Sequence, residues 1–342
     1  MSSIREKKKR QEFQYSPEDK ALFESAWKIA RANHGNMFTF YLPGMIRYGQ
    51  QRGRYPAISI TGDQCLLQCE HCKGKLLEPM IKITEPEELV ETSLRFAKNG
   101  SHGILLTGGS DRNGRLPWGK YHEAIKEIKD QTSLYLSAHT GFPDTETCRM
   151  IKEAGVSQGL IDVMGDAKTA TQIYHLNGLK TLFEALDAIE KSGLEFIPHI
   201  VAGLFYGNIN AEYKALQIIR NYRPKALVIV VLTPLKGTPM ARVVPPSPIE
   251  IGRLIARARL MMPEVPISLG CERPRNRAGW LMERLAIQAG ATRMAVWSDE
   301  AIDEAKKSGL IPRFQTTCCS LKFREDFCLM EPEPSHLSHT RK

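Results

Sequence analysis

Short apolar runs alternate with longer amphipathic stretches along most of this chain. The stretches between the runs repeat apolar residues at helical spacing, as in EPEELVETSLRFAKNG at residues 85–100. Strands that are apolar on both faces and alternate with helices indicate a parallel sheet covered by helices. Eight runs rich in Val, Ile and Leu have the length of buried strands: residues 57–61, 103–107, 133–138, 159–164, 195–201, 226–232, 265–269 and 292–297.

The stretch 85–100 carries both helix-end signals. Thr84 and Glu87 have the spacing of a capping box, and Pro86 suits the first turn. Asn99 and Gly100 predict the end of the helix.

Eight strand–helix units over about 240 residues match an α/β fold of the closed (β/α)8, TIM-type barrel class. A doubly wound sheet is the alternative. We expect a helical N-terminal extension at 1–55, with a helix that begins at Ser16-Pro17, the barrel at 56–311, and a Cys-containing C-terminal tail at 312–342. In such a barrel the loops after the strands form the active face.

The composition narrows the class of protein and its expected compartment. The 342 residues are 42% apolar, and no apolar run approaches the roughly 18 residues that would span a membrane. The charged start MSSIREKKKRQEF has no apolar stretch after it, so we expect no signal peptide and a cytoplasmic protein. Eight cysteines in that setting indicate metal ligands or reactive thiols. The net charge of +9 is spread along the chain, with one solvated run at Lys7–Arg10.

The loop CLLQCEHC follows the first predicted strand and holds Cys65, Cys69 and Cys72. A structural zinc site commonly needs four protein ligands, and here His71 is the nearby candidate for a fourth. Three thiolates instead suit a [4Fe-4S] cluster that leaves one iron free to bind a small molecule. The polar neighbours of these cysteines argue against three merely buried thiols.

With this spacing after its first strand, the chain resembles the radical S-adenosylmethionine (SAM) enzymes over about residues 57–297. The resemblance implies that a [4Fe-4S] cluster on Cys65, Cys69 and Cys72 binds SAM and cleaves it to a 5′-deoxyadenosyl radical. It also implies SAM contacts at the other strand ends, in LLTGGSD, GLIDVMGDAKT and IPHIVAGLFYGN, with His139 facing SAM or substrate. The implied cofactor-binding residues are Thr107, Gly108, Gly109, His139, Asp166, Val201, Gly203 and Leu204.

A second group of cysteines is similar to a biotin synthase feature. In ISLGCERPR, Cys271 takes the place of an arginine that ligates the second cluster of biotin synthase, and FQTTCCS adds Cys318 and Cys319. The resemblance implies an auxiliary iron–sulfur cluster on these three thiols, with Ser320 or Cys328 as a fourth ligand. The alternative is a chance pair of small buried residues.

The chain departs from both sulfur-inserting families that it resembles. It lacks the barrel cysteines of biotin synthase at 107–108 and 138–139, and MSSIREKKKRQEFQYS lacks the N-terminal cysteine motif of single-chain lipoyl synthase. With Cys271, Cys318 and Cys319, the chain most resembles the biotin synthase-like chains of the two-component lipoyl synthases, and this resemblance implies sulfur insertion into a protein-bound octanoyl group. The expected partners are SAM, an octanoylated lipoyl-carrier domain, a second radical SAM chain and a reductant such as ferredoxin, with no nucleic acid and no membrane.

Two other classes stay open. One keeps the SAM site without a sacrificial auxiliary cluster, as in a biotin synthase-like or methylornithine synthase-like enzyme or a metal-cofactor maturase. The other is a zinc- or RNA-binding module, against which the scarcity of aromatics near basic residues counts.

Several further residues have both a functional and a structural interpretation. We expect Cys148 to be core and His199 to be a satisfied interior residue, whereas Asp162 could be structural or part of the mouth. The three arginines that follow Cys271 could meet the carrier or the SAM carboxylate, or be solvated: Arg273, Arg275 and Arg277.

Overall fold

All eight predicted strands are present in one sheet of the computed structural model, which describes residues 15–44 and 46–331. Each pairs in parallel with its neighbours in chain order, as expected for successive strand–helix units. These strands are β4 (Ala57–Ser59), β6 (Gly103–Thr107), β7 (Tyr135–His139), β8 (Gln158–Asp162), β9 (Glu195–Ala202), β10 (Leu227–Val231), β11 (Ile267–Leu269) and β12 (Arg293–Ala295).

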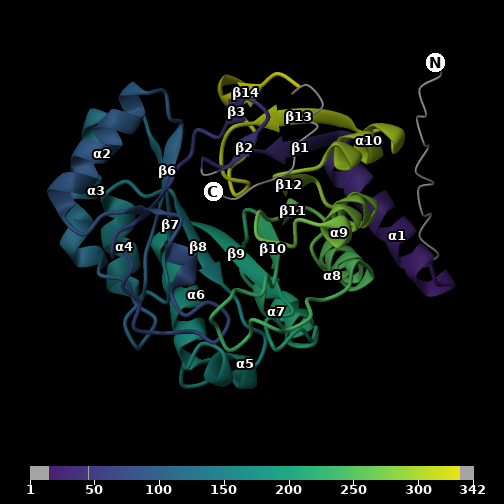
Figure 1. The fold of residues 1–342 in the computed structure, drawn as a ribbon, viewed down its shortest axis with the longest axis horizontal. Helices are drawn as coiled ribbons and strands as arrows, with labels where there is room; N and C mark the ends of the chain where they lie inside the picture. The colour runs from purple at the N-terminus through teal and green to yellow at the C-terminus, as the bar shows by residue number, and fades with distance from the viewer. Residues whose placement is uncertain (1–14, 45, 332–342) are drawn as a thin grey trace, which may run out of the picture.

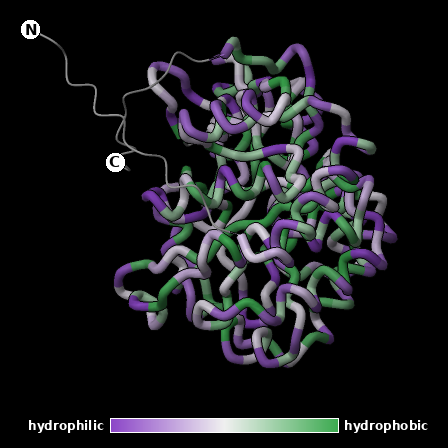
Figure 2. Tube along the Cα trace, turned by 90° about the vertical axis from the view of Figure 1, so that its right-hand side faces the viewer, coloured by the Kyte–Doolittle hydropathy of each residue, from purple (hydrophilic) through white to green (hydrophobic). Residues whose placement is uncertain are grey.

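Helices cover the outer side of this sheet (Figure 1), which confirms the predicted α/β fold of the TIM type. Along the trace, hydrophobic and hydrophilic residues alternate at short intervals (Figure 2), as amphipathic helices on a buried sheet require. Within the described residues, no helix has the length and apolarity needed to cross a membrane. The helices are α1 (Pro17–His34), α2 (Pro86–Lys98), α3 (Trp118–Gln131), α4 (Thr145–Glu153), α5 (Ala167–Gln172), α6 (Lys180–Ser192), α7 (Ala211–Ile219), α8 (Pro248–Met261), α9 (Arg277–Gln288) and α10 (Asp299–Lys307).

The predicted extension and tail both add strands to the sheet. β1 (Met37–Tyr41) lies between β12 and β13 (Ile311–Gln315), in parallel with both, and β14 (Cys328–Leu329) pairs antiparallel with β13. At the other end β5 (Ile81–Lys82) pairs with β4. The sheet thus has twelve strands and curls as a half-barrel rather than closing as an eight-stranded cylinder.

Two strand ends meet where the sheet curls round. The Arg54 N–H, just before β4, donates to the Thr316 C=O, just after β13, at 2.7 Å. A two-stranded hairpin, β2 (Arg47–Tyr48) and β3 (Gln51–Arg52), stands apart from the main sheet. The division into an extension, a barrel and a tail at 55/56 and 311/312 stays a prediction.

The helix starts follow the sequence signals in one case and not in the other. Ser16 caps α1, since its Oγ accepts the Asp19 N–H at 3.1 Å, and Pro17 is the first helical residue. In α2 the cap is Glu85, so the predicted Thr84 cap is wrong; the Thr84 C=O instead accepts the Tyr121 hydroxyl at 2.7 Å. The predicted stop is confirmed, with Asn99 at the C-cap of α2.

Candidate functional site

The three-cysteine loop follows β4. Backbone hydrogen bonds within the loop and to neighbouring segments hold it in place. The Cys72 and Lys73 N–H groups donate to the Cys69 C=O at 3.2 and 2.9 Å, which forms a tight turn. The Leu66 N–H donates to Ser110, and the Glu70 N–H donates to Ile173. The loop is therefore tied to the segments that follow β6 and β8, at the carboxyl ends of the strands.

The loop brings metal-ligating atoms together. The ligand atoms of Cys69, His71 and Cys72 lie within 4.8 Å of one another. Cys65 is half-buried and is not part of this group; its charge adds to the effect of Cys72 and of burial in raising the pKa of Cys69. The Cys69 thiol, and then His71, lower the pKa of Cys72 to about 4, which favours a thiolate there. His71 Nδ1 is buried without a hydrogen-bond partner in the described part of the chain.

This donor set fits an iron–sulfur cluster. All three cysteines are free thiols in a half-buried loop, and thiolates are the usual ligands of such clusters. His71 lies as near as the thiols, so it has the geometry of a ligand or of a hydrogen-bond donor to Cys72.

The predicted glycine segment packs directly against this loop. The Gly109 N–H donates to Thr61 Oγ1 at 2.7 Å, and a Cβ at Gly109 would lie 1.9 Å from the Gln64 carbonyl oxygen and 2.5 Å from Cys65 Cβ. At Gly108 a Cβ would lie 3.1 Å from the Thr61 side chain. Glycine at 109 is required by this close approach. Thr107 is buried at the end of β6, and contact of these residues with SAM stays a prediction.

The ends of β7, β8 and β9 place an ionisable cluster in the barrel interior. Asp162 accepts the Tyr174 hydroxyl at 2.9 Å and lies 3.5 Å from His139 Nε2, while the His139 and His199 rings are 5.5 Å apart. Burial alone would raise the pKa of Asp162, but the His139 contact outweighs it and holds that pKa far below its ordinary value. Burial and the neighbouring His139 lower the pKa of His199 to about 4. Asp162 is thus a carboxylate that orients His139.

Sequence reasoning missed part of this cluster. Tyr174 lies in the segment after α5, where no local pattern connects it with β8. His199 was expected to be interior, and it is half-buried with its ring beside His139. The His71 and Tyr174 rings lie 5.5 Å apart with their planes tilted by 54°, and this contact links the cluster to the cysteine loop.

The remaining predicted SAM contacts lie at the expected strand ends. Asp166 caps α5, since its Oδ1 accepts the Thr169 N–H at 2.8 Å, so this carboxylate already has a structural role. Val201 is half-buried in β9, and Leu204 is buried just beyond it. Gly203, at φ +78°, donates its N–H to Glu212 Oε1 at 2.7 Å.

Glu212 was also missed by sequence reasoning. It is buried in the first turn of α7, and its two oxygens accept the backbone N–H groups of Gly203 and Asn210. The side chain thereby fixes the turn that follows β9. An acidic residue in a first helical turn is a common sequence feature, so the signal was present but not specific.

The second group of cysteines comes from two distant segments, the loop after β11 and the segment after β13. Cys271 follows β11 and is exposed at the surface, while desolvation of its thiol, followed by the charge of Cys318, raises its pKa to about 11. The adjacent Cys319 thiol lowers the pKa of Cys318 to about 6, and Cys318 in turn raises that of Cys319. Among the described residues these three thiols do not form a group with ligand atoms within 4.8 Å of one another, so a shared auxiliary cluster on them stays a prediction.

The segment with Cys318 and Cys319 runs inside the barrel. Cys319 packs with Leu160, Ile197 and other inward-facing strand residues, and Arg293 Nη1 donates to the Cys319 C=O at 3.1 Å. Cys318 also contributes to the raised pKa of His139, so the segment faces the ionisable cluster.

The two candidate fourth ligands differ in their surroundings. Ser320 is buried, and its Oγ has no hydrogen-bond partner among the described residues. Cys328 is exposed on β14, where its thiol donates to the Arg324 C=O. The orphaned Ser320 hydroxyl fits a ligand role better than Cys328 does.

The arginines after Cys271 need one correction. Arg273 is buried, pairs with Glu283 at 2.6 Å and donates to the Ala295 and Val296 carbonyls, so neither a contact with a carrier or SAM nor a solvated position holds for this residue. Arg275 donates to the Cys271 C=O and thus supports that loop. Cys148 is fully buried in α4, as predicted.

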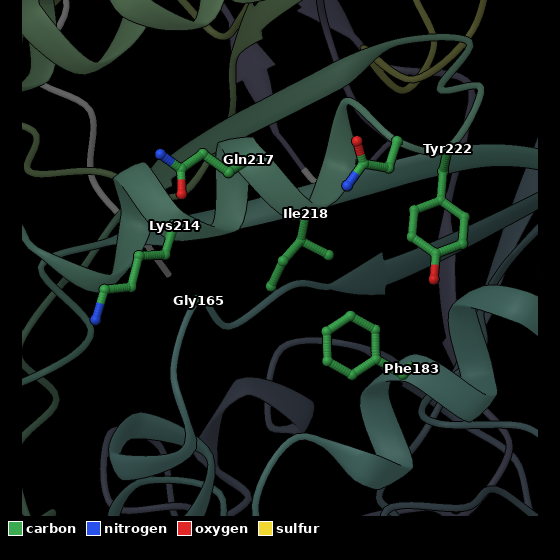
Figure 3. A pocket seen from close by; sticks show the side chains of 7 residues that line it. Gly165, Phe183, Lys214, Gln217, Ile218 and Tyr222 are labelled. Carbon is green, nitrogen blue, oxygen red and sulfur yellow. The ribbon is translucent and has the colours of Figure 1, made fainter.

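A separate hollow of about 580 Å³ lies outside the barrel between α6 and α7 (Figure 3). It contains no residue of either cysteine group and no predicted SAM contact. Its lining residues are Gly165, Phe183, Lys214, Gln217, Ile218, Asn221 and Tyr222.

Comparisons with known proteins agree with this architecture. Residues 228–328 match the model of the Biotin and Thiamin Synthesis associated domain, a span that includes the second cysteine group. A biotin synthase from Thermodesulfovibrio yellowstonii is 23% identical over 219 residues, which cover 63% of this chain and 67% of that enzyme.

Two solved structures share the fold. The crystal structure of methylornithine synthase (PylB) has a TM-score of 0.60 at 17% identity and covers 87% of this chain and 90% of that chain. The crystal structure of HydG, a maturase of the FeFe-hydrogenase, has a TM-score of 0.62 at 15% identity and covers 88% of this chain and 69% of that chain.

Proposed function

We propose that this chain is a radical SAM enzyme of the biotin synthase type, which holds two iron–sulfur clusters and inserts sulfur at unactivated C–H bonds. The observation that carries the proposal is the presence of two separate cysteine groups on one barrel, Cys65/Cys69/Cys72 and Cys271/Cys318/Cys319. A barrel that only cleaves SAM needs the first group alone.

Cys65, Cys69 and Cys72 would hold the [4Fe-4S] cluster, and Cys271, Cys318 and Cys319 an auxiliary cluster, with Ser320 the preferred fourth ligand. When bound, the first cluster and SAM supply a 5′-deoxyadenosyl radical, and the second supplies sulfur. An electron donor such as ferredoxin would serve the first.

The chain's own residues provide positioning and shielding. Gly109 lets the segment after β6 approach the cysteine loop, and His139, oriented by Asp162, offers an N–H to a ligand in the barrel interior. The Cys318–Ser320 segment covers the inner face of the strands and excludes water from it. Hydrogen-atom abstraction depends on such positioning.

For the substrate we propose a protein-bound octanoyl group, which makes the chain one component of a two-chain lipoyl synthase. Support comes from the auxiliary cysteines and from the absence of biotin synthase cysteines at Thr107-Gly108 and Ala138-His139. The residues at these strand ends, including the His139–Asp162 pair, are not thiols.

A biotin synthase-like enzyme is the second candidate, and the comparisons favour it. The matched sequences carry that name, the domain match at 228–328 is to the Biotin and Thiamin Synthesis associated domain, and none of the relatives described above is a lipoyl synthase. A mutase or maturase without an auxiliary cluster is the third, on the fold alone.

Iron counting separates sulfur insertion from the third candidate. Anaerobically reconstituted protein should contain about eight irons, and a Cys271→Ala, Cys318→Ala, Cys319→Ala variant about four, with SAM cleavage retained. A Cys148→Ala variant should keep the full iron content. About four irons in the unaltered protein, by Mössbauer and sulfide analysis, would reject the auxiliary cluster.

Substrate tests separate the first two candidates. An octanoylated lipoyl-domain peptide and dethiobiotin are each supplied with SAM and reductant, and sulfurated products are measured by mass spectrometry. Thiolated octanoyl peptide is the expected result, and biotin alone would favour the second candidate.

A further inference from the structure

The turn after β9 presents an aromatic ring to solvent. Tyr206 has φ 50°, in the left-handed region that a residue with a Cβ rarely adopts, and it is 43% exposed. The rings of Phe205 and Tyr206 meet edge to face at 5.4 Å, and this contact stabilises the turn. A strained turn that exposes a large ring indicates a surface used for contact.

Two neighbouring loops extend this surface. A Cβ at Gly207 would lie 2.3 Å from the Val244 carbonyl oxygen, so the loop after β10 packs against the Tyr206 turn, and Val244 itself is 80% exposed. On the other side, Lys168 Nζ of α5 lies 4.4 Å from the centre of the Phe205 ring. Apolar groups and a cation are therefore contiguous here.

The charge of this surface has one sign. The loop 232–247 contains Lys236 and Arg242, both exposed, and no Asp or Glu. In the part of the chain that the structure describes, neither of these residues nor Lys168 is in an ion pair with a carboxylate. A surface with unpaired cations around exposed apolar side chains is complementary to an acidic protein.

The surface lies at the same end of the sheet as the cysteine loop. β8, β9 and β10 are parallel, so the loops after them lie at the same end of the sheet as the Cys65–Cys72 loop. A Cβ at Gly237 would lie 3.3 Å from Lys75 Cε, so the loop after β10 contacts a residue three positions beyond Cys72. A partner seated there would have its substrate within reach of the barrel interior.

We propose that this mouth patch, formed by Lys168, Tyr206, Lys236, Arg242 and Val244, docks an acidic carrier domain that delivers the substrate on a flexible side-chain arm. The inference deepens the proposed function and rests on it, because a free small substrate would need no docking surface. The exposed apolar side chains provide contact area. The three cations orient the carrier domain and increase its rate of association.

The test measures binding of an acidic lipoyl domain, unmodified or octanoylated on its lysine, to anaerobically reconstituted full-length protein by calorimetry. The patch variant is Lys168→Gln, Lys236→Gln, Arg242→Gln. The matched control, Lys98→Gln, Lys126→Gln, Lys191→Gln, makes the same charge change on exposed positions of α2, α3 and α6. A Tyr206→Asn variant removes the ring with a residue that tolerates positive φ.

We expect the patch variant and Tyr206→Asn each to bind the unmodified domain about tenfold more weakly than the control does. The affinity of the unaltered protein should fall more steeply with salt than that of the patch variant. Melting temperatures should match, which would show that the fold is intact. Equal Kd values in the patch and control variants would overturn the proposal, as would a patch-dependent homodimer that excludes the domain.

The readouts separate this proposal from the proposed function. If the domain binds through the patch but no sulfurated octanoyl product forms, the sulfur-insertion proposal fails and the patch stands. If product forms with the same KM for the carrier in the patch and control variants, the patch fails and the function stands.

Discussion

Gly109→Ala is the sharpest test of how the glycine segment supports the cysteine loop. The added methyl group would lie 1.9 Å from the Gln64 carbonyl oxygen, whereas real Cβ contacts do not fall below 3.0 Å, so one backbone segment must move by about 1 Å. The same methyl group would lie 2.5 Å from Cys65 Cβ. The movement therefore falls on the first predicted cluster ligand.

The expected loss of activity differs between glycine positions, because the space around each added methyl group differs. A misplacement of about 1 Å at a site of this kind lowers activity about 100-fold. Gly108→Ala should have a smaller effect, because its methyl group meets the Thr61 side chain at 3.1 Å and that side chain can shift. Gly119→Ala, on α3 with nothing within 4 Å, is the matched control and should raise stability by up to about 1 kcal/mol.

The assay measures iron per chain and 5′-deoxyadenosine formed from SAM with excess reductant, beside thermal unfolding of each variant. Gly109→Ala should lose the iron of the Cys65–Cys72 loop and SAM cleavage while it still unfolds cooperatively. If Gly109→Ala matched Gly119→Ala in iron content and in deoxyadenosine, the close packing of the two loops would have no functional importance.

Three further predictions concern the scaffold. Asp19→Asn should lower the free energy of unfolding at pH 7 by about 2 kcal/mol, because Asp19 accepts two hydrogen bonds from Arg253. Since those bonds lower the pKa of Asp19, its contribution is present above about pH 4 and lost below it, so urea titrations of the two proteins should converge in acid. Arg273→Met should cost about 3 kcal/mol, because Glu283 is left buried without its partner; an unchanged urea midpoint would contradict this. Burial raises the pKa of Cys148 to about 12, so iodoacetamide at pH 8 should leave this thiol unmodified in the folded protein, as peptide mass mapping would reveal.

The barrel strands were predictable because each is a local run of apolar residues buried on both faces. β1 and β13 were missed for a physical reason. The sequence IPRFQ of β13 is polar in part and contains a proline, and MFTFY of β1 stands outside the strand–helix repeat. Each becomes a strand because the other supplies its backbone partner, and no local pattern contains that information.

The candidate site, like the fold, was predictable only where its residues are close together in the sequence. The spacing of Cys65, Cys69 and Cys72 is local and was readable from the sequence. The burial of Arg273 could not be predicted, because it depends on Glu283 and on carbonyls of another strand. Tyr174 and Glu212 likewise gain their roles from contacts that join separate elements.

The position of β1 between β12 and β13 also bears on how the protein is made. Met37 pairs with Ile311 and Thr39 with Arg293, so a strand emerging early from the ribosome waits for partners translated more than 250 residues later. At about 5–20 residues per second that delay lasts tens of seconds, during which the apolar strand is exposed to chaperones and to misassembly. The Cys318–Cys319 segment is translated later still, so a cofactor that needs all three auxiliary thiols can be inserted only after synthesis has passed it.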